Sequence, residues 1–336
     1  MTAVLNSGRV DVPAFDELDR QLIHALHCDG RAAFSAIGEV LAVSDKTVAR
    51  RYARLRAAGA LRVFAHVRMH SSGSKAWSLR IRCGSAATAV AEELAHRPDT
   101  SWVAITSGAG EVLCTSQNND DGDNTALFTA TLPRTTVVES VAAQRILYGF
   151  AMEGTGFAAK HGPLTDAQTR RLSAGVPAAA APPLTPATPM SLSSTDHKML
   201  TVLAQDGRRD YERLAEDIDC SPSTVRRRIA ELRSAQILQF GVEADWSAFG
   251  LKSRAALWLS VQPAYLDAAG RALAEHPEVT GVAAVTGPAN LFAGIIVPDE
   301  TSMYGYLAGK LAAIPGIVHV ETVPVVRLVK RAARAL

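Results

Sequence analysis

One stretch of the sequence, Ser221–Arg233, carries side chains suited to binding nucleic acid. Ser221 is a favourable N-cap and Pro222 suits the first helical position, so a helix should begin here. Three apolar residues recur at helical spacing and should be buried, namely Val225, Ile229 and Leu232. Thr224 and Arg227 then lie on the exposed face. Hydroxyl and guanidinium groups in that position could bind phosphate oxygens and base edges.

An arginine-rich helix on its own is more often a solvated surface helix, but here the whole pattern occurs twice. A shift of 177 residues, from Asp19 to Asp196, aligns the two halves of the chain without gaps through the first domain of each half. Identical residues at matching positions include Asp29-Gly30-Arg31/Asp206-Gly207-Arg208, Glu39/Glu216, Ser44/Ser221, Thr47-Val48/Thr224-Val225, Arg50-Arg51/Arg227-Arg228 and Leu55-Arg56/Leu232-Arg233. This density of matches indicates a duplicated unit.

Each copy begins with three helical patterns and a strand. In the first copy the apolar stripes predict helices near 18–28, 34–41 and 45–58, and a strand at 61–67. The second copy repeats this order, with a helix at 221–235 and a strand near 237–242. Because a tight turn joins the last two helices, the pattern predicts a helix-turn-helix in each half. Between Ser44 and Arg62, six basic residues face one acidic residue, Asp45, as expected of a phosphate-binding surface.

The rest of each copy alternates strands and helices in the order βαββαβ, which predicts a ferredoxin-like sandwich. The fold class is therefore α+β, with two winged-type helix-turn-helix domains and two sandwich domains in tandem. A Pro/Ala-rich stretch between the halves predicts a linker, in which Thr165 could cap a short helix. The expected domains are helix-turn-helix 14–67, sandwich 74–153, linker 154–192, helix-turn-helix 193–245 and sandwich 252–332.

Composition favours a multi-domain globular protein of the cytoplasm. The chain has 336 residues, 48% of them hydrophobic, and a net charge of +2, so evidence for a nucleic-acid partner must be local. Four cysteines lie far apart, which argues against a disulfide framework or a zinc site: Cys28, Cys83, Cys114 and Cys220. No histidine pattern has metal-ligand spacing, and no apolar run spans a membrane. We expect no metal, no cofactor and no enzymatic activity.

A helix-turn-helix followed by a βαββαβ domain resembles the Lrp/AsnC family of transcriptional regulators. The resemblance rests on Leu18-Asp19, Asp29-Gly30-Arg31, Ser44 and Thr47-Val48-Ala49-Arg50-Arg51 with their second-copy counterparts. It implies binding to double-stranded DNA, and sandwich domains that oligomerise and sense an amino acid or related metabolite. We expect either a homo-oligomer or an intrachain pseudo-dimer in which the two sandwiches pair face to face.

The family's ligand hairpin usually has the sequence Gly-Asp-x-Asp. Here the two hairpins are Gly108-Ala109-Gly110-Glu111 and Gly287-Pro288-Ala289-Asn290. The resemblance therefore makes Gly108, Glu111, Gly287 and Asn290 the candidate effector-binding residues. Both glycines could equally serve a turn that needs a positive φ.

We expect DNA contacts from both copies of the basic helix. The candidates are Ser44, Lys46, Thr47, Arg50, Arg51, Arg54, Ser221, Ser223, Thr224, Arg227 and Arg228. Thr47, Arg50 and their counterparts are the candidates for base edges, whereas Arg51 and Arg228 lie closer to the apolar stripe and should bind a phosphate or a carboxylate partner. Because Glu231 replaces Arg54 in the second copy, the two helices should prefer different half-sites. Two alternatives remain, a ligand-binding or interaction module without regulatory DNA binding and an architectural DNA binder of low specificity.

Overall fold

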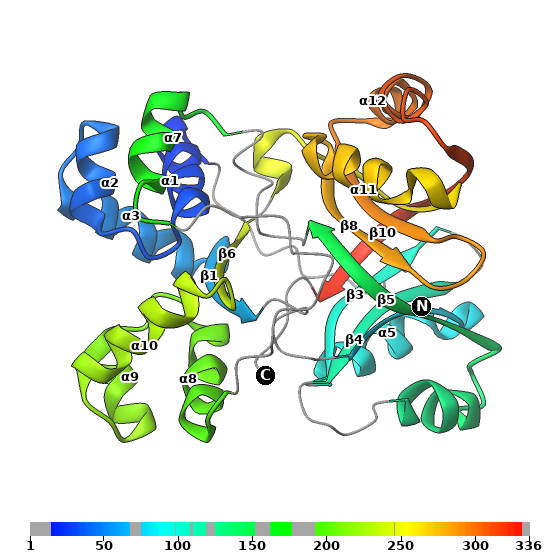
Figure 1. Ribbon diagram of the computed structural model, residues 1–336, viewed down its shortest axis with the longest axis horizontal. Coiled ribbons are helices and arrows are strands. Elements are labelled where there is room, and N and C mark those ends of the chain that lie inside the picture. The colour runs from blue at the N-terminus through cyan, green and yellow to red at the C-terminus, as the bar shows by residue number, and fades with distance from the viewer. Residues whose placement is uncertain are drawn as a thin grey trace, which may run out of the picture.

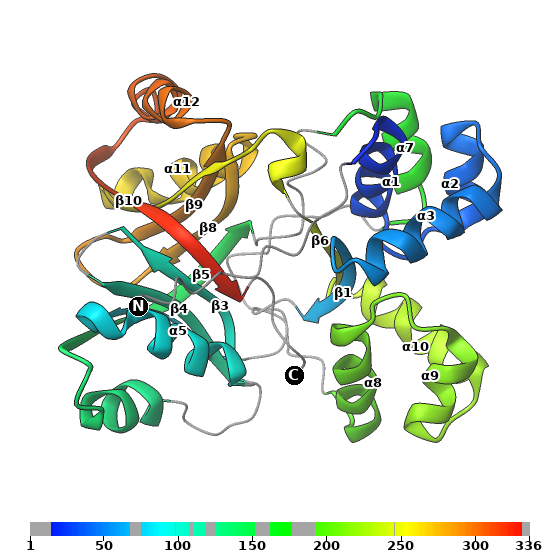
Figure 2. The same ribbon diagram turned by 180° about the vertical axis from the view of Figure 1, so that it is seen from behind.

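The computed structural model describes residues 15–67, 75–97, 99–107, 110–118, 125–151, 162–176, 192–244 and 246–330. Two helical units, here called head 1 and head 2, lie side by side, and two sandwiches lie next to them (Figures 1 and 2). Head 1 consists of α1 (Glu17–Cys28), α2 (Phe34–Leu41), α3 (Asp45–Ala57) and β1 (Leu61–Val67). Head 2 consists of α8 (Ser194–Gln205), α9 (Tyr211–Ile218), α10 (Pro222–Ser234) and β6 (Leu238–Ala244). Among these described residues, no helix is long and apolar enough to cross a membrane.

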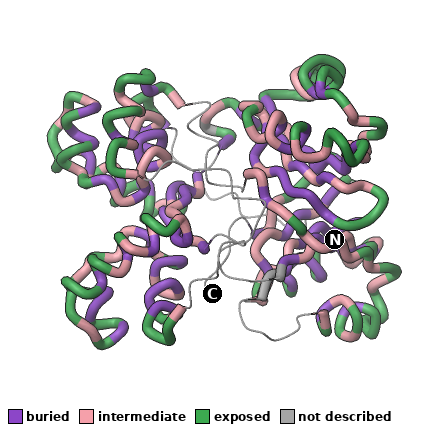
Figure 3. Tube along the Cα trace, in the orientation of Figure 1, coloured by how far each residue is buried: buried purple, intermediate pink, exposed green. Residues whose placement is uncertain are grey.

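The third helix of each head begins and packs as its sequence predicts. The Oγ atom of Ser44 accepts a hydrogen bond from the backbone N–H of Thr47, and Ser221 caps α10 in the same way. The apolar stripe of α10, Val225, Ile229 and Leu232, is fully buried. Burial of each such side chain stabilises the folded state by roughly 1.5–3 kcal/mol. Figure 3 shows how buried and exposed residues alternate along the helices of both heads. The helix is therefore fixed along one side and presents its other side to solvent.

The two heads exchange strands. Strand β1 pairs antiparallel with β6, from Leu61 opposite Ala244 to Val67 opposite Leu238. The end of β1 places Ala65 and Val67 in the core of head 2, and β6 places Val242 and Ala244 in the core of head 1. Each head is thus completed by the other half of the chain, which fixes the position of one head relative to the other.

Each sandwich has the ferredoxin-like order that the sequence predicts. The first consists of β2 (Lys75–Arg82), α5 (Ala87–His96), β3 (Thr100–Thr106), β4 (Glu111–Asn118) and β5 (Ser140–Ala151). The second consists of β7 (Ser253–Val261), α11 (Leu266–Glu275), β8 (Val279–Val285), β9 (Leu291–Val297) and β10 (Ile317–Lys330). The helix expected near 124–130 is a π-helical segment, Leu127–Thr131. The helix expected at 301–313 begins as α12 (Glu300–Gly305) and continues as a π-helical segment to Leu311.

The two sheets join into one closed barrel in the order β10-β3-β4-β2-β5-β8-β9-β7. The long final strand of each copy makes this possible, because β5 pairs first with β2 and then with β8. Likewise β10 pairs with β7 through Pro324 and with β3 from Val325 onward. Helices α5 and α11 pack on the outside of the barrel. The two sandwiches therefore form a pseudo-dimer within one chain.

An additional helix, α7 (Asp166–Ser173), packs on head 1 against α1 and α2 (Figure 1). Leu164 and Leu172 join the core of head 1, and the backbone N–H of Leu164 donates to Nδ1 of His24 at 3.1 Å. The neighbouring His27 packs against Trp246, and the centroids of the two rings are 5.4 Å apart. Both ring nitrogens of His27 are buried and have no hydrogen-bond partner among the described residues. Head 1, α7 and the start of the second sandwich thus meet around two histidines.

Acid should loosen this junction. Burial, together with the nearby His24, lowers the pKa of His27 from 6.5 to about 3, so the folded chain holds a neutral ring while the unfolded chain takes up a proton below pH 6.5. Stability is therefore greatest above pH 6.5 and declines as the pH falls, by roughly 2 kcal/mol for this residue at pH 5. Thermal melts between pH 7.5 and 5 should show a smaller loss in His27→Phe. The control is the same change at exposed His96. An unchanged profile for His27→Phe would contradict the assignment.

Candidate nucleic-acid interface

The exposed side of α3 presents a cluster of polar and basic groups near its first turns. Lys46 and Arg50 are exposed and Thr47 is half-buried, and the hydroxyl of Thr47 lies 2.9 Å from that of Ser44. No ion pair with an acidic residue is formed by Lys46 or Arg50 among the described residues. Their cationic groups are therefore available to an anionic partner.

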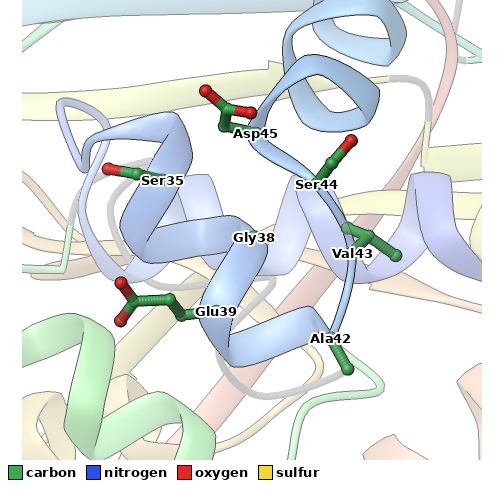
Figure 4. A pocket seen from close by; sticks show the side chains of 7 residues that line it. All are labelled: Ser35, Gly38, Glu39, Ala42, Val43, Ser44 and Asp45. Atoms are coloured by element: carbon green, nitrogen blue, oxygen red, sulfur yellow. The ribbon is translucent and has the colours of Figure 1, made fainter.

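Helix α3 is set against α2 by a tight left-handed turn at Ala42, where φ is 55°. Gly38 allows this approach, since a Cβ at that position would lie 2.6 Å from the carbonyl oxygen of Val43. An open groove results between α2 and the start of α3, and Figure 4 shows the residues that line it, Ser35, Gly38, Glu39, Ala42, Val43, Ser44 and Asp45. We refer to these residues as the turn groove. The turn of head 2 repeats this conformation at Asp219, where φ is also 55°.

Two of the arginines predicted to contact DNA are held by carboxylates inside head 1. Arg51 donates to Asp16 at 2.6 Å and to Asp19 at 2.9 Å, and Arg54 donates to the second oxygen of Asp19. The carboxylate of Asp19 is fully buried, whereas the side chain of Arg54 remains 45% exposed. Of the two partners considered for Arg51, the geometry favours the carboxylate. The basic residues of α3 thus divide into a set that positions the helix and a set that faces solvent.

Head 2 repeats the buried pair and then departs from it. Arg228 donates to both oxygens of Asp196 at 2.8 Å. Burial alone would raise the pKa of Asp196, but the hydrogen bonds from Arg228 and Ser193 lower it to about 2. Glu231 binds Arg228 at 3.0 Å and Arg227 at 2.6 Å. The second helix therefore presents Arg227 together with a carboxylate, whereas Arg50 in the first helix has none beside it.

The repeated Asp-Gly-Arg motif locks the two heads together. Arg31 donates to the carbonyl oxygens of Gly207 and Arg209 at 2.8 and 3.2 Å. In return Arg208 donates to the carbonyls opposite it on head 1, those of Gly30 and Ala32, at 2.7 and 2.9 Å. Each guanidinium also stacks on an aromatic ring of the opposite head, Tyr211 or Phe34. The sequence marked these residues as repeated but gave no sign that the arginines act across the heads.

The candidate effector residues make their contacts within the chain. Glu111 is buried in the barrel and binds Arg80 at 3.0 Å, and Arg80 also binds Glu321 at 2.7 Å. The side-chain amide of Asn290 both accepts from and donates to the backbone of Val261, each at 2.8 Å. Gly287 has a φ of 108°, as a turn glycine does. Gly108 lies outside the described residues.

Comparison with known proteins identifies the two domain types. The model of the AsnC-type helix-turn-helix domain matches residues 15–56 and 192–233, and that of the Lrp/AsnC ligand binding domain matches residues 254–335. An uncharacterized HTH-type transcriptional regulator of Pyrococcus abyssi is 30% identical over 134 residues, which cover 40% of this chain and 85% of that protein. The chain belongs to the Lrp/AsnC family. This member carries the helix-turn-helix domain twice.

Other relatives agree with this assignment and extend the fold. The Bkd operon transcriptional regulator of Pseudomonas aeruginosa is 26% identical over 136 residues, which cover 39% of this Lrp/AsnC chain and 88% of the regulator. The crystal structure of a siroheme decarboxylase aligns with a TM-score of 0.60 and 11% identity, over 94% of this chain and 93% of that one. At this identity the likeness concerns the fold alone. It shows that the arrangement of two heads and two sandwiches occurs elsewhere.

Proposed function

We propose that this Lrp/AsnC protein is a cytoplasmic, sequence-specific DNA-binding transcriptional regulator, rather than an enzyme, and that one chain supplies both reading heads. The observation that carries the proposal is the pair of fixed heads, each with a capped helix whose exposed side carries hydroxyl and guanidinium groups. Lys46, Thr47 and Arg50 serve head 1, and Ser223, Thr224 and Arg227 serve head 2. Ser44 and Ser221 order the start of each helix, where backbone N–H groups can also meet phosphates.

The two heads should prefer different half-sites. Arg50 forms no ion pair among the described residues, whereas Arg227 is bound by Glu231. A carboxylate at this position repels phosphate but can accept a hydrogen bond from a cytosine amino group. Arg51, Arg54 and Arg228 contribute by holding the helices in place and by adding positive charge. A perfectly palindromic binding site with equal protection of both halves would contradict this part of the proposal.

The test begins by selecting duplexes from a random pool with the purified chain. Binding of selected and random duplexes is then measured across a range of salt concentrations, because phosphate contacts give a steep salt dependence and base contacts give discrimination. Arg50→Ala and Arg227→Ala should each cost roughly 1–3 kcal/mol on the selected site, and less on random DNA. The control is Arg20→Ala, which removes a half-buried arginine that pairs with Glu17 on α1.

Each other outcome favours a different function. Equal affinity for selected and random duplexes indicates an architectural DNA binder. No binding at any salt concentration leaves a ligand-binding or interaction module, and the siroheme decarboxylase fold then makes an iron tetrapyrrole the first ligand to try. The effector implied by the family resemblance stays a prediction, and an amino acid or related metabolite that shifts DNA affinity would support it.

A further inference from the structure

Helix α7 packs on head 1 and has no equivalent on head 2 within the part of the chain that the structure describes. The side-chain amide of Gln168 donates to the carbonyl oxygen of Val40 at 3.0 Å, at the end of α2, while Leu164 and Leu172 enter the core. The positions of head 2 that correspond to His24 and Val40 hold Thr201 and Asp217. Among the described residues, no element packs on α8 and α9 as α7 packs on α1 and α2. The duplication is thus broken at this face.

The outward side of α7 is basic and borders the turn groove. Arg170 and Arg171 are both exposed. The guanidinium of Arg171 lies 3.9 Å from a carboxylate oxygen of Glu39, and Figure 4 shows Glu39 in the same groove as Ser44 and Asp45, where α3 begins. The basic surface of α7 is therefore continuous with the surface of head 1 that we propose meets DNA.

Acidic residues near the start of α3 explain why the arginines of α7 would strengthen DNA binding. Glu39 and Asp45 are both exposed beside the start of α3, where they would repel phosphate. Arg171 offsets part of this charge, and its contact with Glu39 is long and exposed, with 62% and 72% of the two side chains accessible. Such a surface pair is weak. An arginine held so loosely can exchange its carboxylate partner for a phosphate, which it can bind with two parallel hydrogen bonds.

We propose that α7 is an accessory DNA-binding element, in which Arg170 and Arg171 bind backbone phosphates immediately outside the half-site of head 1. The proposal rests on the proposed function, since it requires head 1 to bind a duplex. It makes head 1 the more strongly anchored of the two, through contacts that carry no sequence information of their own.

The test compares the chain with the double variant Arg170→Ala/Arg171→Ala on two duplexes. One extends about a helical turn beyond the half-site of head 1, and the other ends at its edge. On the long duplex the variant should bind roughly ten-fold or more weakly, and its log–log salt slope should fall by about 2, because each phosphate contact contributes about 0.9. On the short duplex the variant and the unaltered chain should bind equally. The charge-matched control is Arg134→Ala/Arg271→Ala, which removes two arginines from the sandwiches.

Three results would overturn the proposal, and they are distinguishable. If the unaltered chain binds no duplex, the proposed function fails and this inference fails with it. If the chain binds DNA but the variant keeps the full salt slope on the long duplex, only the role of α7 is wrong. If the variant loses affinity equally on both duplexes, α7 merely supports the fold of head 1. A thermal melt of the variant accompanies the last comparison.

Discussion

Replacing Asp19 by Ala is expected to lower the stability of the protein by about 3 kcal/mol, since removal of one partner from a buried ion pair leaves an uncompensated charge. Asp19 is 0% exposed and holds both Arg51 and Arg54. It also accepts from the backbone N–H of Asp16 in the capping box of α1. The expected loss lies at the lower end for such pairs because Arg51 can still bind Asp16 and Arg54 can reach water. Denaturant unfolding monitored by circular dichroism measures the change.

Two further variants separate charge from shape. Asp19→Asn keeps an acceptor for the cap but removes the charge, so its effect should fall between that of Asp19→Ala and no change. The control on the same helix is Glu17→Ala. Glu17 forms an exposed pair with Arg20, so its replacement should lower the stability by less than about 0.5 kcal/mol. If Asp19→Ala lowers the stability by less than about 1 kcal/mol, Arg51 and Arg54 are hydrated in the variant, and the prediction is wrong.

The double variant Arg31→Ala/Arg208→Ala should loosen one head relative to the other, although β1 and β6 still join them, and should weaken binding to a complete two-half-site duplex by about ten-fold. It removes four charge-assisted hydrogen bonds between the heads, each of which contributes roughly 1.5–3 kcal/mol where it is buried. Fixed heads gain from the high effective concentration of the second half-site once the first is bound. Heads that are held only by the β1–β6 pairing and the remaining ion pairs move more freely and lose part of that gain. Fluorescence anisotropy with a labelled duplex measures the affinity of the unaltered chain and that of the double variant.

The decisive comparison uses a duplex with a single half-site. Affinity for that duplex should be unchanged in the double variant, because neither arginine lies among the exposed groups of α3 or α10. A matched control is Arg209→Ala, which removes the neighbouring arginine whose side chain pairs at the surface with Asp217. An equal loss on single and double half-sites would mean that the variant damages each head rather than their relative position.

The duplication, the fold class and the order of elements could all be predicted from the sequence. Apolar periodicity and caps are local signals, and Val225, Ile229 and Leu232 became the buried stripe of α10 for that reason. The role of each arginine could not be predicted in the same way. Arg50 and Arg51 are adjacent in the sequence, yet only Arg51 reaches Asp16 and Asp19, 35 and 32 residues earlier. Whether an arginine faces solvent or a buried carboxylate depends on how the helices pack, which no local pattern reports.

The joined barrel and the docking of α7 were also beyond local reasoning. Strand β5 was expected, but nothing in its own sequence shows that Ile146 onward pairs with β8 of the other copy. Thr165 indicated a helix, but the place of that helix on head 1 depends on contacts beside His24, where head 2 has Thr201 instead. In both instances the information lies in the match between distant surfaces.

The contact between Arg80 and Trp258 depends on a difference between the two halves of the chain. Both stand at equivalent places in their sheets, each between two buried core residues, Leu79 and Ile81 or Leu257 and Leu259. Their contact across the barrel brings the Arg80 guanidinium 4.2 Å from the Trp258 ring. In a symmetric assembly of identical chains these positions would place arginine against arginine, or tryptophan against tryptophan. The two halves are complementary at this point, so neither half could form this contact with a copy of itself.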